Sequence, residues 1–508
     1  MRHYSLPDFL LIFCLGLTVT SMQGRDLYVA PGGKASGRGT PLRPYNLATA
    51  LSGRAGGPGD TFWLEGGDYS IGHINTKIQG APGRPITFRS RPGEWARVDG
   101  SVEFWDSRGY VVLRDFEIYS SDTNRASSQR NAEFKPTDVK LFSGIASFSP
   151  NLSFINLVVH DATREGIYVS QTSSNNLIYG CIIYNIGWKS VDNAEGHGIY
   201  MQGWDGGREV ADNIVFNNSG ADLHIYDDTA GYPLENIVVK GNVAFNGGAI
   251  QNVRYYRDTL VGVDRPSTFA NNIIFENNMG YFASDNGRAD YVQIGREGTN
   301  GSVIIKDNYL PEGLELNNWC RAVVTGNVFG APAHCDALQV KQRVPLRGDW
   351  DNNTYVISPN ADGETRFNSH TLAFSDWKKQ SRCDSNSACT VGKFTGTKIF
   401  MRPNRYEKGR ADIIVYNWDN LNTVAVDVSS VLSRGDAYEV RNAEDYFARP
   451  VLSGVYDAQP LKLPMAGLSV AAPNGPMMTP QPTGPAFNVF VLLKKSQHKS
   501  GGAGEALN

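Results

Sequence analysis

The sequence lacks an excess of charge of either sign. Its 508 residues carry 48 Lys and Arg against 51 Asp and Glu, which gives a formal net charge of −3. Nucleic acids and anionic membrane surfaces attract proteins through concentrated positive charge. The near-balance gives no electrostatic reason to expect either partner, and we expect no nucleic acid to bind.

Cysteine is also scarce. The chain has six cysteines, and none lies in a zinc-site spacing or an obvious catalytic setting. Cys383 and Cys389 share one polar loop and could pair in an oxidising compartment. Cys320 and Cys335 form a weaker second pair, and Cys181 fits an inert core thiol.

Long apolar runs are missing except at the N-terminus, which reads MRHYSLPDFLLIFCLGLTVTSMQG. Arg2 and His3 precede an apolar stretch from Phe9 to Val19, which is too short to span a bilayer comfortably. This pattern is typical of a secretory signal peptide. We therefore expect residues 1–24 to be cleaved, leaving a secreted or periplasmic protein without a membrane attachment. An uncleaved anchor is the alternative.

Glycine and short recurring strands are what the sequence does contain. It has 54 glycines, and one set of strands begins at Gly144, Gly166, Gly198, Asp222, Gly248, Tyr291, Gly313 and Ala337. A second set interleaves with it, from NIVFNN to AVVTGN. Two or three short strands in every 20 to 30 residues, with no helix, predict a parallel β-helix.

Strand alternation then predicts which side chains point inward. Successive side chains of a strand point to opposite faces. We expect these residues in the core: Ile167, Val169, Ile199, Met201, Leu223, Ile225, Leu314 and Leu316. The second strand set ends in asparagines at matching places, namely Asn242, Asn278, Asn308 and Asn327. We interpret these as turn residues that hydrogen-bond from coil to coil.

The segment before the repeats contains PGDTFWLEGGDYS and GRPITFRSRPGE. These phrases resemble the opening of right-handed parallel β-helix proteins of the pectate-lyase-like superfamily, and the later GHGIYMQG and GNVAFNGG runs look like its secreted bacterial members. The resemblance covers about Asp26 to Asn353. It implies the fold but leaves the reaction open, because the superfamily includes lyases, hydrolases, epimerases and non-catalytic adhesins.

The fold class expected is therefore all-β, a right-handed parallel β-helix followed by a small C-terminal β-sandwich. We predict the β-helix at 25–353, a linker or irregular segment at 354–394, the sandwich at 395–495 and a disordered tail at 496–508. The sandwich could bind glycan, cap the helix or only support it, and support is the preferred interpretation. Because the repeats carry their own core, we expect the β-helix to survive removal of the sandwich.

The outward side chains of one sheet should line a groove. The alternation gives this ladder: Tyr168, Tyr200, His224, Gln251, Gln293, Glu315 and Gln339. Aromatic rings stack on sugars and amides hydrogen-bond hydroxyl groups. Gln202, Tyr226, Arg254 and Arg257 complete the substrate-binding residues that we predict. A solenoid that merely exposes polar side chains is the simpler reading.

Ionisable residues gather in three adjacent coils, and we predict His197, His224, Glu165, Asp192 and Glu195 as catalytic. Flanking glycines would leave the His197 imidazole accessible. The phrase GHGI also resembles the strand start of polygalacturonases. However, the Asn-Thr-Asp, Asp-Asp and Arg-Ile-Lys phrases of that family are missing, so its mechanism is not carried over.

Three functions stay open. Two carboxyl groups could hydrolyse a glycosidic bond. A base, with cationic residues or Ca²⁺ held by aspartates, could instead eliminate across a uronate. The third reading is a secreted, non-catalytic β-helix that binds glycan or a surface. The sequence favours a carbohydrate-active monomer with a polysaccharide as partner, and a metal site is not identified.

Overall fold

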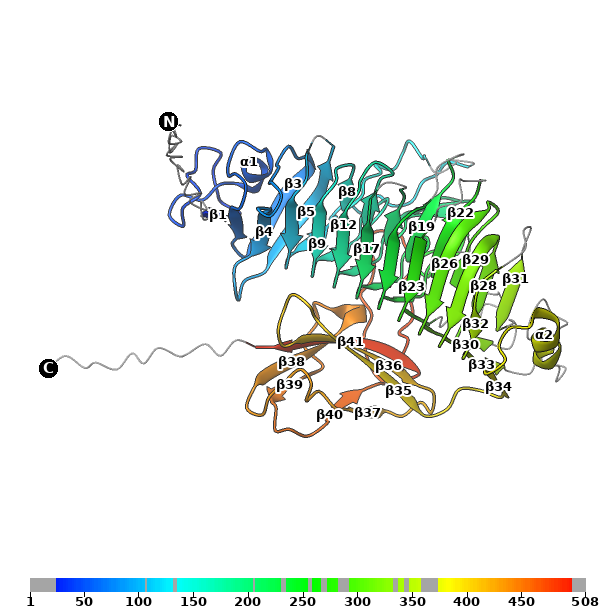
Figure 1. Cartoon of the computed structure of the whole chain (residues 1–508). Coiled ribbons are helices and arrows are strands. Elements are labelled where there is room, and N and C mark those ends of the chain that lie inside the picture. The colour runs from blue at the N-terminus through cyan, green and yellow to red at the C-terminus, as the bar shows by residue number, and fades with distance from the viewer. Residues whose placement is uncertain are drawn as a thin grey trace, which may run out of the picture.

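The computed structural model is a right-handed parallel β-helix followed in the chain by an antiparallel β-module, which lies alongside the coils (Figure 1). The structure describes residues 24–105, 107–130, 135–203, 206–229, 234–254, 258–265, 272–281, 292–331, 337–341, 347–357 and 373–495. The predicted signal sequence, except for Gly24, and the tail 496–508 lie outside these residues.

Each coil contributes one strand to each of three parallel faces. In the described residues, sheet 1 has the twelve strands β1 (Asp26–Val29), β2 (Thr61–Leu64), β4 (Ile86–Ser90), β6 (Val111–Arg114), β9 (Leu152–Ile155), β12 (Asn176–Tyr179), β17 (Arg208–Ala211), β20 (Ile237–Lys240), β23 (Asn272–Glu276), β26 (Asn300–Lys306), β29 (Trp319–Thr325) and β32 (Trp350–Asp351).

The other two faces are joined by two long strands, β3 (Gly67–Asn75) and β5 (Ala96–Phe104), which run through both. Sheet 2 adds β7 (Glu117–Tyr119), β10 (Val158–His160), β13 (Ile182–Tyr184), β18 (Ile214–Phe216), β21 (Val243–Phe245), β24 (Met279–Tyr281), β27 (Tyr309–Leu310), β30 (Val328–Ala331), β33 (Thr354–Ile357) and β34 (Ala388–Val391). Sheet 3 adds β8 (Ile145–Ser147), β11 (Ile167–Val169), β16 (Ile199–Met201), β19 (Leu223–Asp227), β22 (Thr259–Val263), β25 (Val292–Ile294), β28 (Leu314–Asn317) and β31 (Leu338–Lys341).

The core of the β-helix is a continuous column of apolar side chains from all three faces. The residues predicted to point inward are all buried and belong to this column: Ile167, Val169, Ile199, Met201, Leu223, Ile225, Leu314 and Leu316. In the parallel register, Ile167 pairs with Ile199 and Ile199 with Leu223, so like positions stack from coil to coil. The prediction from strand alternation is confirmed.

A ladder of buried asparagines runs along the bend between sheets 1 and 2. The Asn242 side-chain amide donates to the Asn278 side-chain oxygen at 3.0 Å, and Asn278 donates to Asn308 at 3.2 Å. Asn308 continues the chain to Asn327 at 2.8 Å. Each side-chain oxygen also accepts the backbone N–H of the preceding coil's asparagine. The predicted structural role of these residues is confirmed, since they satisfy the polar groups of a buried bend.

Short helices lie at the two ends of the column (Figure 1). Helix α1 (Leu47–Leu51) buries Leu47, Ala50 and Leu51, and helix α2 (Phe374–Ser381) buries Trp377 against the same core. Within the described residues, no helix has the length and apolarity that crossing a membrane requires.

Beside α2, Cys383 and Cys389 are both unbonded thiols. The parallel ladder continues past Asn353, because β33 pairs with β30 and β34 pairs with β33 in the segment predicted as a linker. The last rungs of sheet 2 are thus built from residues whose repeat pattern has faded.

The C-terminal module is a small sandwich of antiparallel strands. Its larger sheet is ordered β35 (Thr397–Pro403), β36 (Arg410–Asn417), β41 (Phe487–Lys494), β38 (Ala437–Asn442) and β39 (Leu452–Val455). The smaller sheet pairs β37 (Thr423–Val426) with β40 (Leu461–Pro464), and the short helix η1 (Ala443–Asp445) follows β38. Val424, Leu463 and Phe490 help to form its own core.

This module packs directly on the outer face of sheet 2. Phe216 and Phe245 of the β-helix join Tyr416, Phe487 and Val489 of the module in one buried cluster. The interface also contains a hydrogen bond, in which the Tyr416 hydroxyl donates to the Gly280 carbonyl oxygen at 2.7 Å. The module therefore shields apolar surface that the coils leave outside, and the structure argues against the expectation that the β-helix survives without it.

Candidate active-site groove on sheet 3

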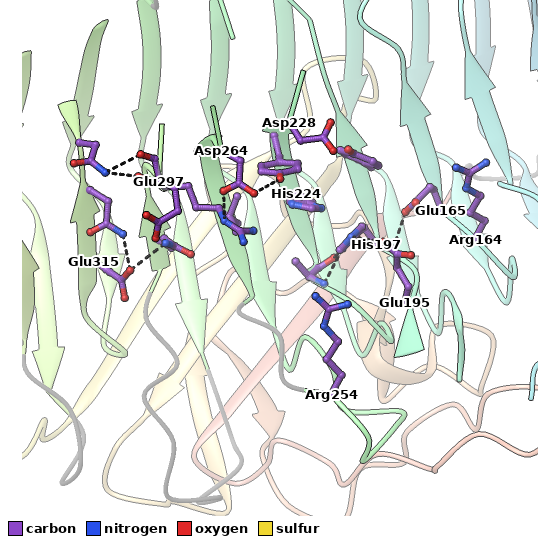
Figure 2. Close-up of a pocket in the computed structure, with 18 of the residues that line it drawn as sticks. Arg164, Glu165, Glu195, His197, His224, Asp228, Arg254, Asp264, Glu297 and Glu315 are labelled. Atoms are coloured by element: carbon purple, nitrogen blue, oxygen red, sulfur yellow. Dashed lines mark hydrogen bonds and ion pairs between the residues drawn. The ribbon is translucent and has the colours of Figure 1, made fainter. Parts of the chain in front are cut away.

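Sheet 3 carries an open groove of about 1010 Å³ on its outer face. It extends across several coils, from Arg164 and Glu165 near β11 to Glu315 and Lys341 near β28 and β31. Figure 2 shows this arrangement, with Glu165 at one end, His197 and His224 between and Glu315 at the other end. Four of the five residues predicted as catalytic line the groove, namely Glu165, Glu195, His197 and His224.

Aromatic rings stack along the groove in the order that the sequence predicts. In the parallel register, Tyr200 lies between Tyr168 and His224. The Tyr200 and His224 rings stack with centroids 4.9 Å apart and an interplanar angle of 16°. Gln202 links the tyrosines, because it accepts a hydrogen bond from the Tyr168 hydroxyl at 2.7 Å and donates to the Tyr200 oxygen at 3.2 Å.

Gln251 does not lie on this ladder. The strand predicted at Gly248 is a turn, and the next rung is β22, where Leu260 pairs with His224 and with Gln293. Gln251 is buried instead, and its side-chain oxygen accepts the backbone N–H groups of Val253 and Arg254. The prediction was wrong because the apparent repeat GAIQN falls within a long connection, which moves the rung eleven residues along the chain from Gly248 to Thr259.

His197 is buried, with an exposure of 1 %, at the edge of the groove. The expectation that its flanking glycines leave the imidazole accessible is therefore wrong, because the backbone at Gly220 packs against the ring. The Ala221 backbone N–H donates to its Nδ1 atom at 2.9 Å, which leaves the proton of the neutral ring on Nε2. Nε2 lies 3.8 Å from the Glu195 carboxylate. Burial lowers the pKa of His197 to about 3, against the opposing effect of the Ala221 carbonyl oxygen, which lies 3.3 Å from Nδ1 and favours the protonated ring. The ring is therefore neutral at physiological pH.

His224 is the more accessible of the two histidines. Its ring centroid lies 4.0 Å from that of His197. Burial, followed by His197 and the positive charges of Arg296 and Arg254, holds the pKa of His224 well below 6.5. Among the described residues its Nδ1 atom has no hydrogen-bond partner. That atom is buried, whereas the ring as a whole is partly exposed at the groove wall, where a neutral imidazole can exchange a proton with a bound ligand.

Glu165 and Glu195 are carboxyl groups with weakened acidity. Glu165 is 4 % exposed, and one of its oxygens accepts the His197 backbone N–H at 2.8 Å. Burial raises the pKa of Glu165 to about 8, and the nearby Glu195 contributes to the rise. Burial likewise raises the pKa of Glu195 to about 7, although Arg254 and Arg164 oppose it. Both groups hold protons in a pH range where an ordinary glutamate is ionised.

Asp192 is separated from this cluster. The groove is flanked by a hairpin of β14 (Trp188–Lys189) and β15 (Ala194–Glu195), and Asp192 lies exposed in its turn. The Ser190 hydroxyl donates to the Asp192 carboxylate at 3.2 Å. The hairpin thus brings Glu195 to the groove and leaves Asp192 at the surface.

Cationic side chains line the same groove. Exposed Arg164 lies at one end, Arg254 approaches the His197 region, and Arg296 pairs with Asp264 at 2.7 Å. Arg254 was predicted from the sequence. The predicted Arg257 lies outside the described residues.

The far end of the groove is built from amides and carboxyl groups. Gln293 donates to Glu315 at 3.0 Å, and the Tyr226 hydroxyl donates to Asp264 at 2.6 Å. Gln293, Glu315 and Tyr226 were predicted as substrate-binding residues, and all three line the groove.

Asp264, Arg296 and Lys341 were not predicted as site residues. Lys341 ends β31 two residues beyond the outward Gln339, so the same alternation could have identified it. Arg296 lies past the end of β25, two residues beyond the inward Ile294, so alternation would have placed it in the core. Asp264 follows β22, the strand that the sequence placed wrongly at Gly248. Asp264 could therefore not be identified without the correct register. In the part of the chain that the structure describes, no group of three His, Cys, Asp or Glu side chains is arranged to hold a metal ion.

Comparison with known proteins gives one family match. The model of the right handed beta helix region matches residues 104–244. No curated protein matches the chain. Among solved structures, pectate lyase Pel9A is 16 % identical in sequence, and the match covers 65 % of this chain and 80 % of that chain with a TM-score of 0.39. GH136 lacto-N-biosidase from Eubacterium ramulus is 13 % identical, with 73 % of this chain and 68 % of that chain covered and a TM-score of 0.45. Alginate lyase from Paenibacillus sp. str. FPU-7 is 16 % identical, with 69 % of this chain and 99 % of that chain covered and a TM-score of 0.41.

Proposed function

We propose that this right-handed parallel β-helix protein is a carbohydrate-active enzyme that cleaves an anionic polysaccharide in the groove of sheet 3, by β-elimination. The observation that carries the proposal is the juxtaposition of neutral His224, half-buried at the groove wall, and the weakly acidic carboxyl groups of Glu165 and Glu195, in a groove lined by guanidinium groups.

Elimination at a uronate sugar has three requirements. The sugar carboxylate must be neutralised, a base must remove the C5 proton, and the O4 leaving group must be protonated. Arg254, Arg296 and Arg164 supply positive charge along the groove. His224 is neutral and half-buried, so it can accept the C5 proton. The C5–H electron pair then forms the C4=C5 double bond as the C4–O4 bond breaks.

Glu195 is the acid that fits the leaving oxygen. Its side chain is 25 % exposed, so it reaches ligand in the groove, whereas Glu165 is almost fully buried. A pKa of about 7 keeps a large share of Glu195 protonated near neutral pH. Glu165 and His197 act as positioning residues, because the Glu165 carboxyl group holds the His197 backbone and His197 lies beside Glu195.

Hydrolysis is the second candidate, and the pair of raised carboxyl pKa values favours it. One protonated glutamic acid and one carboxylate beside the glycosidic bond are the groups that glycosidases use. In that case Glu165, with the higher pKa of about 8, protonates the leaving oxygen, and Glu195, with a pKa of about 7, is the carboxylate that assists the attacking water.

The deciding experiment incubates the purified protein with polygalacturonate, alginate, hyaluronan, xylan and a β-glucan. Products with ultraviolet absorbance from a C4=C5 double bond support elimination. New reducing ends without that absorbance support hydrolysis. Binding without any product supports the non-catalytic glycan-binding alternative and contradicts the enzymatic proposal.

We also propose that the protein acts outside the cytoplasm as a monomer. The basis is the signal-like segment 1–24 of the sequence. N-terminal sequencing of protein recovered from the periplasm or medium should find cleavage near Gly24, and light scattering should give the mass of one chain. Protein that keeps Met1 and stays in the cytoplasmic fraction would contradict export.

A further inference from the structure

Two aromatic side chains extend the outer face of sheet 3 beyond the groove described above. Trp105 follows β5 and is 53 % exposed, and half-buried Phe148 follows β8. Their rings stack with centroids 3.7 Å apart and an interplanar angle of 20°. Neither residue belongs to the groove around His197 and His224.

The register places this pair on the same face as the proposed active site. Glu103 of β5 pairs with Ala146 of β8, and Ala146 pairs with Tyr168 of β11. Trp105 and Phe148 lie two residues beyond Glu103 and Ala146, so their side chains point to the same side. Phe148 also contacts Tyr168 edge-on, with centroids 5.4 Å apart. The aromatic row is therefore continuous from Trp105 to His224.

Trp105 is held in place by polar contacts. Its indole N–H donates to the Glu103 carboxylate at 2.6 Å, and the His73 ring lies 3.3 Å from the same carboxylate. An exposed indole fixed in this way offers a rigid apolar surface with acceptor and donor groups beside it. That combination suits a sugar ring, whose C–H face stacks on aromatics while its hydroxyl groups hydrogen-bond at the edge.

We propose that Trp105 and Phe148 form a distal sugar-binding subsite for the same polysaccharide chain that is cleaved near His224. This inference rests on the proposed function. Four rung steps separate the two places, from β5 through β8, β11 and β16 to β19. At about 4.8 Å per step the span is roughly 19 Å, which is longer than a disaccharide.

The subsite makes the enzyme sensitive to substrate length. A long chain contacts both places and gains affinity from the stacking at Trp105, whereas a disaccharide bound at His224 cannot reach it. Trp105 does not touch the reacting atoms, so the gain falls on KM and not on kcat.

The test compares Trp105→Ala with a matched control, Trp63→Ala. Trp63 is a partly exposed tryptophan on sheet 1 whose indole N–H also donates to a carboxylate, that of Asp26, at 2.8 Å. The measurements are KM and kcat on the cleaved polymer and on its size-fractionated oligosaccharides, and Kd for the polymer by calorimetry. Melting curves verify that each variant is folded.

For Trp105→Ala we expect KM and Kd for long chains to rise about 5- to 10-fold, with kcat and the KM for the shortest cleaved oligosaccharides unchanged. Trp105→Phe, which keeps an aromatic ring, should recover most of the affinity, and Trp63→Ala should match the wild type.

Three outcomes overturn the inference. An unchanged KM for long chains in Trp105→Ala, with wild-type cleavage intact, removes the subsite and leaves the proposed function standing. An equal loss in Trp63→Ala means that the effect is not specific to this face. A wild-type protein that neither binds nor cleaves any polysaccharide of the panel overturns the proposed function, and the subsite with it.

Discussion

Sheets 2 and 3 both carry outward rows of stacked aromatic rings that include a histidine, but the row on sheet 2 is covered and the row on sheet 3 is open. On sheet 2, His160 stacks between Tyr119 and Tyr184 and contacts Phe447 of the C-terminal module. On sheet 3, His224 stacks on Tyr200 in an open groove. Stacking in register is therefore common to both rows. The difference between them is whether another part of the chain covers the row.

The two histidines differ most in their charge. Burial alone would lower the pKa of His160, but hydrogen bonds to Asp161 at 2.7 Å and Glu117 at 3.1 Å outweigh it and raise the pKa to about 9. Arg125 completes this network with a contact of 2.6 Å to Asp161. Since His224 has no such carboxylate partner, it stays neutral. A satisfied ionic network stabilises the fold, whereas a neutral imidazole at an open groove is available for chemistry.

Removal of the module should have the largest effect. A chain ending at Lys393 exposes the apolar outer row of sheet 2, including Phe216 and Phe245. We expect it to aggregate or to lose its cooperative melting, as scattering and circular dichroism would record. Replacing Phe216 and Phe245 with threonine in the shortened chain should improve its solubility. A soluble shortened chain with a sharp melt would contradict this and restore the view that the coils are self-sufficient.

Substitutions at the proposed catalytic residues should come next. His224→Ala and Glu195→Gln should each lower kcat about 10²- to 10⁴-fold, because each removes a proton-transfer group. The melting temperature should change little, since both side chains lie at the groove wall. His160→Ala is the matched histidine control and should keep its turnover. Near-normal turnover in His224→Ala would assign this histidine to scaffolding.

His160→Ala should instead reduce stability. It removes one partner from two buried carboxylates, Glu117 and Asp161, although Arg97 and Arg125 remain beside them. Breaking such a buried network should cost about 3 kcal/mol of the free energy of unfolding. Denaturant titration of this variant and of His224→Ala measures the difference. Equal stabilities would show that sheet 2 does not depend on its ionic network.

The smallest expected effect is a difference in the pH dependence of the melting temperature. The folded pKa of His160, about 9, exceeds its ordinary value of 6.5, so its contribution is complete below pH 6.5 and is lost as the pH rises toward 9. The folded pKa of His197, about 3, lies below 6.5, so its contribution is present above pH 6.5 and is lost as the pH falls toward 3.

His160→Gln should therefore weaken the alkaline loss of stability, and His197→Gln should weaken the acidic loss, each by a few degrees in melting temperature. Glu165, whose pKa burial raises from 4.5 to about 8, adds a loss of stability as the pH rises from 4.5 toward 8, which both variants retain. Identical pH profiles for the two variants would contradict the opposite charge states assigned to these histidines.

Local alternation predicted much of the fold and part of the site. The inward set from Ile167 to Leu316, the asparagine ladder and the order of Tyr168, Tyr200 and His224 follow from strand periodicity and similar coil lengths. Where a connection lengthened, the same reasoning failed. The long segment before β22 placed Leu260 where Gln251 was expected.

The sequence by itself determined the coil repeat, because the direction of a strand side chain is fixed by backbone geometry over a few residues. Only the tertiary structure decided which outward face is open. Tyr184 and Tyr200 look alike in sequence, since each is an outward tyrosine on a short strand. Residues more than two hundred positions away pack over Tyr184 and leave Tyr200 at the groove. That choice sets burial, charge pairing and the pKa values of neighbouring histidines, and no local pattern encodes it.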